Sequence, residues 1–125
     1  MEQLSDRSDH RCEEAVADCR VRAATDLFLH TWNPVVLAAL RPRALRRGTL
    51  RTAIGGISDK VLTETLHRLT GTGLVDRRTG PTGRSVEYAL TPLGRSLVDG
   101  PLRVLGQWAV EHGEELLDAQ EQAAS

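Results

Sequence analysis

The chain has 125 residues, of which 40% are apolar and 26% charged, and its formal net charge is −1. A chain of this size and composition is expected to fold as one domain with a modest core. It has no apolar run long enough to cross a bilayer and no signal peptide, which predicts a cytoplasmic protein with no membrane partner and two reduced cysteines.

The N-terminal third of the chain is predicted to be mainly helical. Residues 1–14 are polar and are expected to form an arm, and residues 15–29 are expected to form a helix. A second helix over residues 32–40 is entered through Asn33-Pro34, because proline is well tolerated in a first helical turn. Apolar residues lie nearly all round this second helix, which predicts that it is the most buried one.

The centre of the chain has the pattern of a helix-turn-helix. Residues 46–49 are expected to form a short strand, residues 50–54 a short helix and Gly55-Gly56 a tight turn. Ser58 can cap the helix that follows, and Asp59 suits the positive end of that helix. A helix, a glycine-containing turn and a second helix together make the helix-turn-helix motif.

A hairpin is predicted directly after the second helix of the motif. The apolar stripe of that helix is formed by Leu62, Leu66 and Leu69. Gly71 and Gly73 are expected to end it, with a strand from residue 74, a turn over residues 80–83 and a returning strand over residues 86–90. A short helix followed by a basic hairpin is the outline of a winged helix, which lays the helix in a DNA major groove and the hairpin against the backbone.

Two further helices are predicted at the C-terminal end. Thr91 caps and Pro92 begins a helix through Val98, Gly100-Pro101 breaks it, and a last helix follows over residues 102–117. The predicted dimer interface is the apolar stripe of this last helix, formed by Leu102, Leu105, Trp108 and Leu116. Helix-turn-helix proteins usually read their operators as two-fold dimers, so a homodimer is expected.

Positive charge is concentrated in the middle of the chain. Residues 41–84 contain ten basic and three acidic residues, a net charge of +7, whereas residues 1–40 sum to −3 and residues 85–125 to −5. A basic middle that contains a helix and a hairpin favours double-stranded DNA as the partner. The expected fold is α+β and mainly helical, a single winged-helix domain over residues 1–125, with the helix-turn-helix and wing in 46–91 and dimerisation helices in 92–120.

Polar side chains on the second helix of the motif are candidates for DNA contact. They are Ser58, Lys60, Thr63, Glu64, His67 and Arg68. Lys60 and Thr63 are near the helix start and best placed for base edges, because lysine suits guanine acceptors and threonine can hydrogen-bond or touch a thymine methyl. In the hairpin, the candidates are Arg77, Arg78 and Arg84, which are expected to bind phosphate or enter the minor groove.

Cys19 and Cys12 are candidate sensing residues. Cys19 lies near a predicted helix start beside Arg20, with Arg22 close, and such surroundings favour the reactive thiolate, although Asp18 opposes it. On one continuous helix the two cysteines would be separated by about 10.5 Å, too far for a disulfide, so an intersubunit bond is the better expectation. An inert buried cysteine is the alternative.

Several linked motifs carry a family resemblance. They are GIS-x-x-VLT from Gly56 to Thr63, GLV at 73–75, VEY-x-LT-x-x-G from Val86 to Gly94, and Cys19 placed thirteen residues before Trp32. Between Cys19 and Trp108 the chain resembles the HxlR-type transcriptional regulators, a bacterial winged-helix group related to MarR. The resemblance implies a homodimeric DNA-binding regulator joined through its terminal helices. It also implies that Cys19 senses quinones, aldehydes or oxidants.

The chain departs from the family pattern at several positions. Thr31 stands where the family usually has lysine, Arg47 and Thr49 stand where an aromatic residue and a glutamate are usual, and Thr52 replaces a common arginine. In the wing, Gly83-Arg84 occupies the region of a usual Pro-Pro pair. These changes leave the fold prediction intact, and they make Arg47 a candidate for a new contact with the DNA backbone.

Two other functions stay open from the sequence. One is a winged-helix regulator gated by a small ligand, with incidental cysteines, and the other is a protein-interaction module that does not bind DNA. The three arginines of the hairpin disfavour the second. The expected small-molecule partner is thus an electrophile that modifies Cys19 or an aromatic ligand. No Gly-rich phosphate loop, nucleophile elbow or standard metal-ligand spacing is present, so we expect neither an enzyme nor a bound metal or cofactor.

Overall fold

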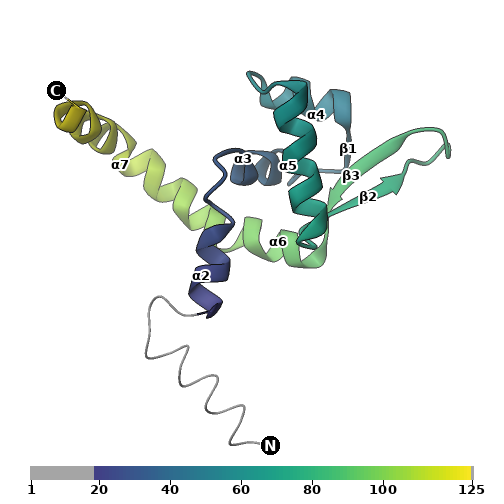
Figure 1. Cartoon of the computed structure of the whole chain (residues 1–125), viewed down its shortest axis with the longest axis horizontal. Coiled ribbons are helices and arrows are strands. Elements are labelled where there is room, and N and C mark those ends of the chain that lie inside the picture. Colours follow the sequence, from purple (N-terminus) through teal and green to yellow (C-terminus); the bar gives the residue numbers. More distant parts are fainter. Residues whose placement is uncertain (1–18, 125) are drawn as a thin grey trace, which may run out of the picture.

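The structure is a computed structural model that describes residues 19–124. The predicted arm, Cys12 and the start of the first predicted helix, residues 15–18, lie outside the described residues. The described elements, in chain order, are α2 (Cys19–Asp26), α3 (Trp32–Ala39), β1 (Leu45–Arg46), α4 (Arg47–Ile54), α5 (Asp59–Gly71), β2 (Val75–Thr79), β3 (Val86–Leu90), α6 (Pro92–Asp99) and α7 (Pro101–Ala124) (Figure 1).

Leucines and valines from α3, α4, α5 and α6 form the core. The predicted stripe of α5 is confirmed, because Leu62, Leu66 and Leu69 are all buried. They pack with Leu37 of α3 and Leu50 of α4 in a single cluster. As predicted, α3 is the most buried of the described helices, since three of its eight residues are buried, a larger share than in any other.

The three strands form one antiparallel sheet in the order β1-β3-β2. The hairpin of β2 and β3 is the predicted wing, and it extends from one end of the molecule (Figure 1). The strand predicted over residues 46–49 is wrong, because β1 ends at Arg46 and α4 already begins at Arg47. Gly48 and Thr49 are weak helix formers, so the sequence did not predict this first turn of α4. Hydrogen bonds from Arg47 to Asp59 and Thr63 of α5 stabilise it.

Local signals place the starts of α5 and α6, and the turn before α5, as predicted. The Ser58 Oγ accepts a hydrogen bond from the Val61 amide at 3.2 Å and caps α5. Gly55 and Gly56 both have φ of +70°, a conformation that suits glycine and makes the tight turn before α5. The Thr91 Oγ1 caps α6 by accepting from the Gly94 amide at 3.0 Å, and it donates to the Gly73 carbonyl at 2.6 Å. This threonine therefore ties the start of α6 to the end of α5.

Helix α6 approaches the chain very closely where α5 gives way to β2. Gly94 is buried in the first turn of α6, and a Cβ placed there would lie 3.0 Å from the Leu74 carbonyl carbon and closer still to the carbonyl oxygen. The Thr91 amide also donates to that oxygen at 3.1 Å. A side chain at position 94 would therefore push α6 away from the base of the wing.

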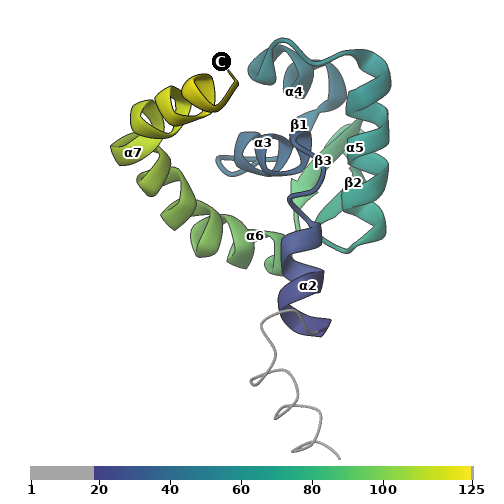
Figure 2. The same cartoon turned by 60° about the vertical axis from the view of Figure 1, so that its left-hand side comes forward.

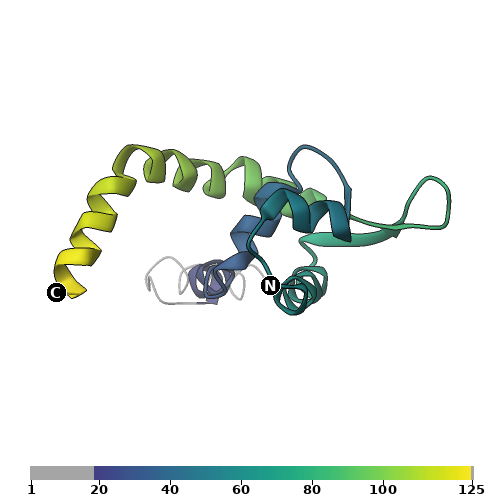
Figure 3. The same ribbon diagram turned by 90° about the horizontal axis from the view of Figure 1, so that it is seen from above.

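The terminal helices differ from the prediction in length. Helix α2 ends at Asp26 rather than at residue 29, and residues 27–29 continue only as hydrogen-bonded turns. The predicted break at Gly100-Pro101 is confirmed, but α7 continues to Ala124 instead of ending at residue 117. Helix α7 projects from the body at the end opposite the wing (Figure 1) and is curved along its length (Figures 2 and 3). None of its 24 residues is buried.

No helix among residues 19–124 combines the length and the apolar character needed to cross a bilayer.

Candidate nucleic-acid interface

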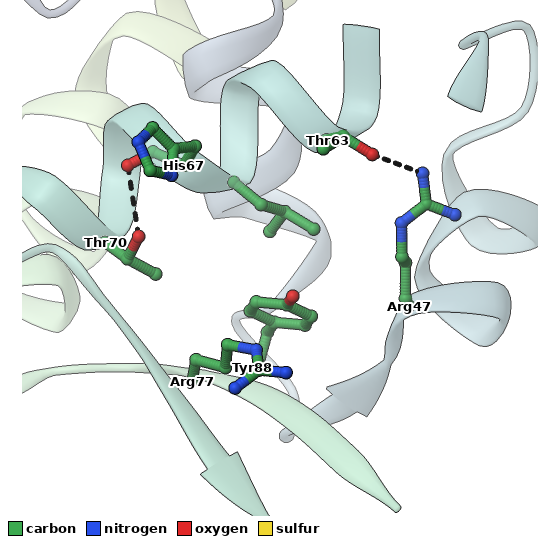
Figure 4. Close-up of a pocket in the computed structure, with 7 residues that line it drawn as sticks. Arg47, Thr63, His67, Thr70, Arg77 and Tyr88 are labelled. Carbon is green, nitrogen blue, oxygen red and sulfur yellow. Dashed lines mark hydrogen bonds between the residues drawn. The ribbon is translucent and has the colours of Figure 1, made fainter. Parts of the chain in front are cut away.

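The structure brings α5 and the wing together around a shared pocket. Residues from α4, α5, β2 and β3 line this pocket, which has a volume of about 170 Å³ (Figure 4). The lining residues are Arg47, Thr63, Leu66, His67, Thr70, Arg77 and Tyr88. Four of the residues predicted to contact DNA thus meet here although they are far apart in sequence: Arg47, Thr63, His67 and Arg77.

The other predicted DNA residues, apart from Arg68, are exposed. They are Ser58 at the N-cap of α5, Lys60 and Glu64 on α5, Arg78 in β2 and Arg84 in the turn of the wing. Within residues 19–124 the structure gives Lys60, Arg77, Arg78 and Arg84 no ion pair. The exposed surface of α5 and the wing therefore carries cationic groups that can meet phosphate.

The Arg47 guanidinium is held by hydrogen bonds to residues of α5. Its Nη1 donates to the Asp59 Oδ1 at 2.8 Å, and its Nη2 donates to the Asp59 carbonyl oxygen at 2.8 Å and to the Thr63 Oγ1 at 2.7 Å. The Arg51 Nη1 lies 3.4 Å from the Asp59 Oδ2. The hydrogen bond from Arg47, together with the charge of Arg51, holds the pKa of the Asp59 carboxyl below its ordinary value.

We refer to Arg47, Asp59 and Thr63 as the clamp, since they join the first helix of the motif to the second. The Asp59 side chain is 64% exposed, so its ion pairs are expected to add little stability and the clamp serves mainly to fix geometry. Arg47 and Thr63 were predicted from the sequence as site residues, whereas the roles of Asp59 and Arg51 were not. The available signal was a pair of arginines four residues apart on α4, facing an acidic residue at the start of α5.

Arg68 lies apart from the other candidates on α5. It is half-buried on the side that faces α3, and its Nη2 donates to the Thr65 Oγ1 at 3.1 Å and to the Asn33 Oδ1 at 3.4 Å. The Asn33 Nδ2 in turn donates to the Leu27 carbonyl at 2.8 Å. This chain of hydrogen bonds uses the Arg68 guanidinium inside the domain, which leaves it poorly placed to reach DNA.

The predicted dimer stripe divides into two parts in the structure. Leu102 packs against the core of its own chain. Leu105, Trp108 and Leu116 are 48%, 46% and 44% exposed, and helical spacing puts them on one face. Val104, Val110 and Leu117, which were not predicted, are also exposed, on other sides of the helix. The Trp108 ring lies 5.2 Å from the His112 ring. Helix α7 thus presents an apolar stripe that the rest of residues 19–124 leaves about half exposed.

Of the two candidate sensing residues, only Cys19 is described, and it is exposed. Within residues 19–124 no group of three or more His, Cys, Asp or Glu side chains is arranged to hold a metal ion.

Comparison with known proteins gives a consistent match. The family model of the HxlR-like helix-turn-helix matches residues 27–116. The HTH-type transcriptional regulator YtfH of Escherichia coli K12, itself uncharacterized, is 35% identical over 108 residues, which cover 86% of this chain and 85% of YtfH. The solved structure of YtfH from Salmonella typhimurium superposes with a TM-score of 0.67 at 31% identity, covering 83% of this chain and 93% of that one.

A second solved relative bears on thiol chemistry. The reduced form of the transcriptional regulator YodB from B. subtilis superposes with a TM-score of 0.66 at 29% identity, covering 74% of this chain and 91% of YodB. A diamide-treated form of YodB has also been solved, and it superposes with a TM-score of 0.62 at 26% identity, covering 76% and 95%. Diamide is a thiol oxidant, so these two structures sample YodB before and after exposure to one.

Proposed function

Because the chain belongs to the HxlR-like helix-turn-helix family of transcriptional regulators, we propose that it binds a double-stranded DNA operator as a homodimer in the cytoplasm. The observation that carries this proposal is the pocket shared by α5 and the wing, where Thr63 and His67 from the helix lie opposite Arg77 from the wing. A helix of this kind enters the major groove while the wing lies along the backbone. This arrangement of the helix and the basic wing supports DNA rather than a protein partner.

Salt dependence tests the DNA contact. Each phosphate contact that is lost should reduce the slope of log affinity against log salt by about 0.9. Arg77→Ala and Arg78→Ala should weaken binding to all sequences alike, whereas Thr63→Ala should change the sequence preference. Arg103→Ala, which removes an exposed arginine from α7, is the matched control and should leave the slope unchanged. No binding to random duplexes even at low salt would favour the protein-interaction module instead.

The proposed dimer interface is the exposed apolar surface of α7. Leu105, Trp108 and Leu116 are each close to half exposed, and burying such side chains is the main favourable term in protein association. Truncation before Pro101 should give a monomer that binds its operator much more weakly. Leu105→Asp leaves the chain length unchanged and should have the same effect, since it places a charge in the interface. Sedimentation of an unchanged dimer in both variants would contradict this interface.

We further propose that Cys19 controls DNA binding through its thiol. The support is its exposure and the similarity to YodB, which has been solved in reduced and diamide-treated forms. In the proposed reaction, the Cys19 thiols of two protomers give up two electrons and two protons to diamide and form one disulfide. Operator binding should respond to diamide in wild type and in Cys12→Ser but not in Cys19→Ser. Equal responses in wild type and Cys19→Ser would remove Cys19 from the mechanism, and no response in either would favour a reversible ligand.

A further inference from the structure

Thr63 differs from the other threonines of α5 in its hydrogen bonding. Thr65 donates its hydroxyl proton to the Val61 carbonyl at 2.7 Å, and Thr70 donates to the His67 carbonyl at 3.0 Å. Such bonds to the helix backbone are the ordinary use of a threonine within a helix. Among the described residues, no group accepts a hydrogen bond from the Thr63 hydroxyl. Its Oγ1 instead accepts from the Arg47 Nη2 at 2.7 Å (Figure 4).

The chemistry of this contact determines what Thr63 can offer to a ligand. A threonine hydroxyl has one proton and two lone pairs, whereas a guanidinium can only donate. The bond from Arg47 therefore occupies a lone pair and leaves the Thr63 proton available. Thr63 is exposed on the second turn of α5, so its hydroxyl can reach a ligand on the side where DNA is proposed to lie.

Asp59 fixes the guanidinium that makes this contact. Arg47 donates to both the Asp59 carboxylate and the Asp59 carbonyl oxygen, so its plane is held at two points besides Thr63. Arg51 approaches the second carboxylate oxygen of Asp59 and also donates to the Ile57 carbonyl at 3.2 Å. Two arginines thus surround one carboxylate, which reduces its repulsion of nearby phosphate. The lowered pKa of Asp59 agrees with this arrangement.

We propose that Arg47 is a specificity-determining positioning residue, which with Asp59 holds Thr63 so that its hydroxyl proton is donated to an acceptor on a base edge. This inference rests on the proposed DNA-binding function. In the major groove the acceptors are purine N7, guanine O6 and thymine O4, whereas cytosine presents an amine. At the base that Thr63 reads, the protein should therefore select against cytosine. Arg47 acts through Thr63 and is not a phosphate contact.

The test compares base preference with salt dependence in the full-length protein. Selection from random duplexes with wild type first defines the preferred operator, and affinities are then measured for that operator and its single-base variants. Thr63→Val removes only the hydroxyl, Arg47→Met removes the clamp cation, and Asp59→Asn leaves Arg47 in place but weakens its anchor. Arg43→Met, at an exposed arginine before β1, is the matched control for the loss of one charge.

Arg47→Met and Thr63→Val should each reduce discrimination against cytosine at the same base position by about threefold to tenfold, the worth of one neutral hydrogen bond. The double variant should lose little further discrimination, because both changes remove the same contact. Asp59→Asn should lower discrimination while raising overall affinity, since it removes a negative charge near phosphate. The salt slope should be unchanged in Arg47→Met, and Arg43→Met should leave base discrimination unchanged.

Two kinds of result would overturn the proposal. If Arg47→Met lowers the salt slope by about 0.9 and leaves base preference unchanged, Arg47 is a phosphate contact. If the Arg47 and Thr63 changes are additive, the two residues do not act through one hydrogen bond. In both cases wild type still binds DNA, so the proposed function survives. Absence of DNA binding by wild type would refute the proposed function and this inference together.

Discussion

Gly94→Ala should destabilise the domain although alanine is the better helix former. The new Cβ would lie 3.0 Å from the Leu74 carbonyl carbon and closer to its oxygen, against backbone that a rotamer change cannot relieve. Overpacking of this kind costs roughly 1–3 kcal/mol or more, and the helix propensity of alanine returns at most about 1 kcal/mol. We expect a net loss of about 2 kcal/mol and a fall of about 5–10 °C in Tm.

The matched control is Gly71→Ala, the same substitution at the last residue of α5. No atom lies within 4 Å of a Cβ at that position, so the variant should be unchanged or more stable, by up to about 1 kcal/mol. Urea denaturation at one fixed protein concentration measures both, because association also contributes to the apparent stability. If Gly94→Ala unfolds at the same urea concentration as Gly71→Ala, α6 is not packed against Leu74 as described.

Three further outcomes are expected. Ser58→Ala should lower the free energy of unfolding by about 1 kcal/mol in urea denaturation, because the Val61 amide loses its cap. Leu62→Ala should cost about 2–5 kcal/mol, since this side chain is fully buried in α5, and an effect below 1 kcal/mol would contradict its place in the core. Asp59→Asn should be less stable than wild type, by an amount that is constant between pH 5 and 7 and disappears in acid. The sign follows from the lowered pKa of Asp59, whose contribution is present above the unfolded value of about 3.9 and is lost as the pH falls through the folded pKa.

Features encoded within a few residues could be predicted from the sequence. The caps at Ser58 and Thr91 and the leucine stripe of α5 depend only on neighbours along the chain, and the structure has them as predicted. The two-residue strand β1 could not be delimited, because it is defined by pairing with β3, more than forty residues away. The secondary-structure propensities of residues 47–49 do not reveal this long-range pairing.

Side-chain partners within the candidate site were harder to predict than its elements. Arg47 binds residues twelve and sixteen positions further along the chain, so its direction depends on how closely α4 approaches α5. Helical spacing likewise placed Arg68 beside the exposed face of α5, but the position of α3 gives it partners inside the domain. The spacing of residues along one helix does not tell how far they lie from another helix.

A dimer formed through α7, as proposed above, would link the amount of this regulator in the cell to its action. Most helical stability in proteins comes from tertiary packing, and no residue of α7 is buried. In the proposed homodimer, helix order and subunit pairing rise together with protein concentration. When most protomers are monomeric, the number of operator-binding dimers grows with the square of the protomer concentration. A twofold change in expression would then change the supply of active dimer about fourfold, which gives a steep response without any ligand.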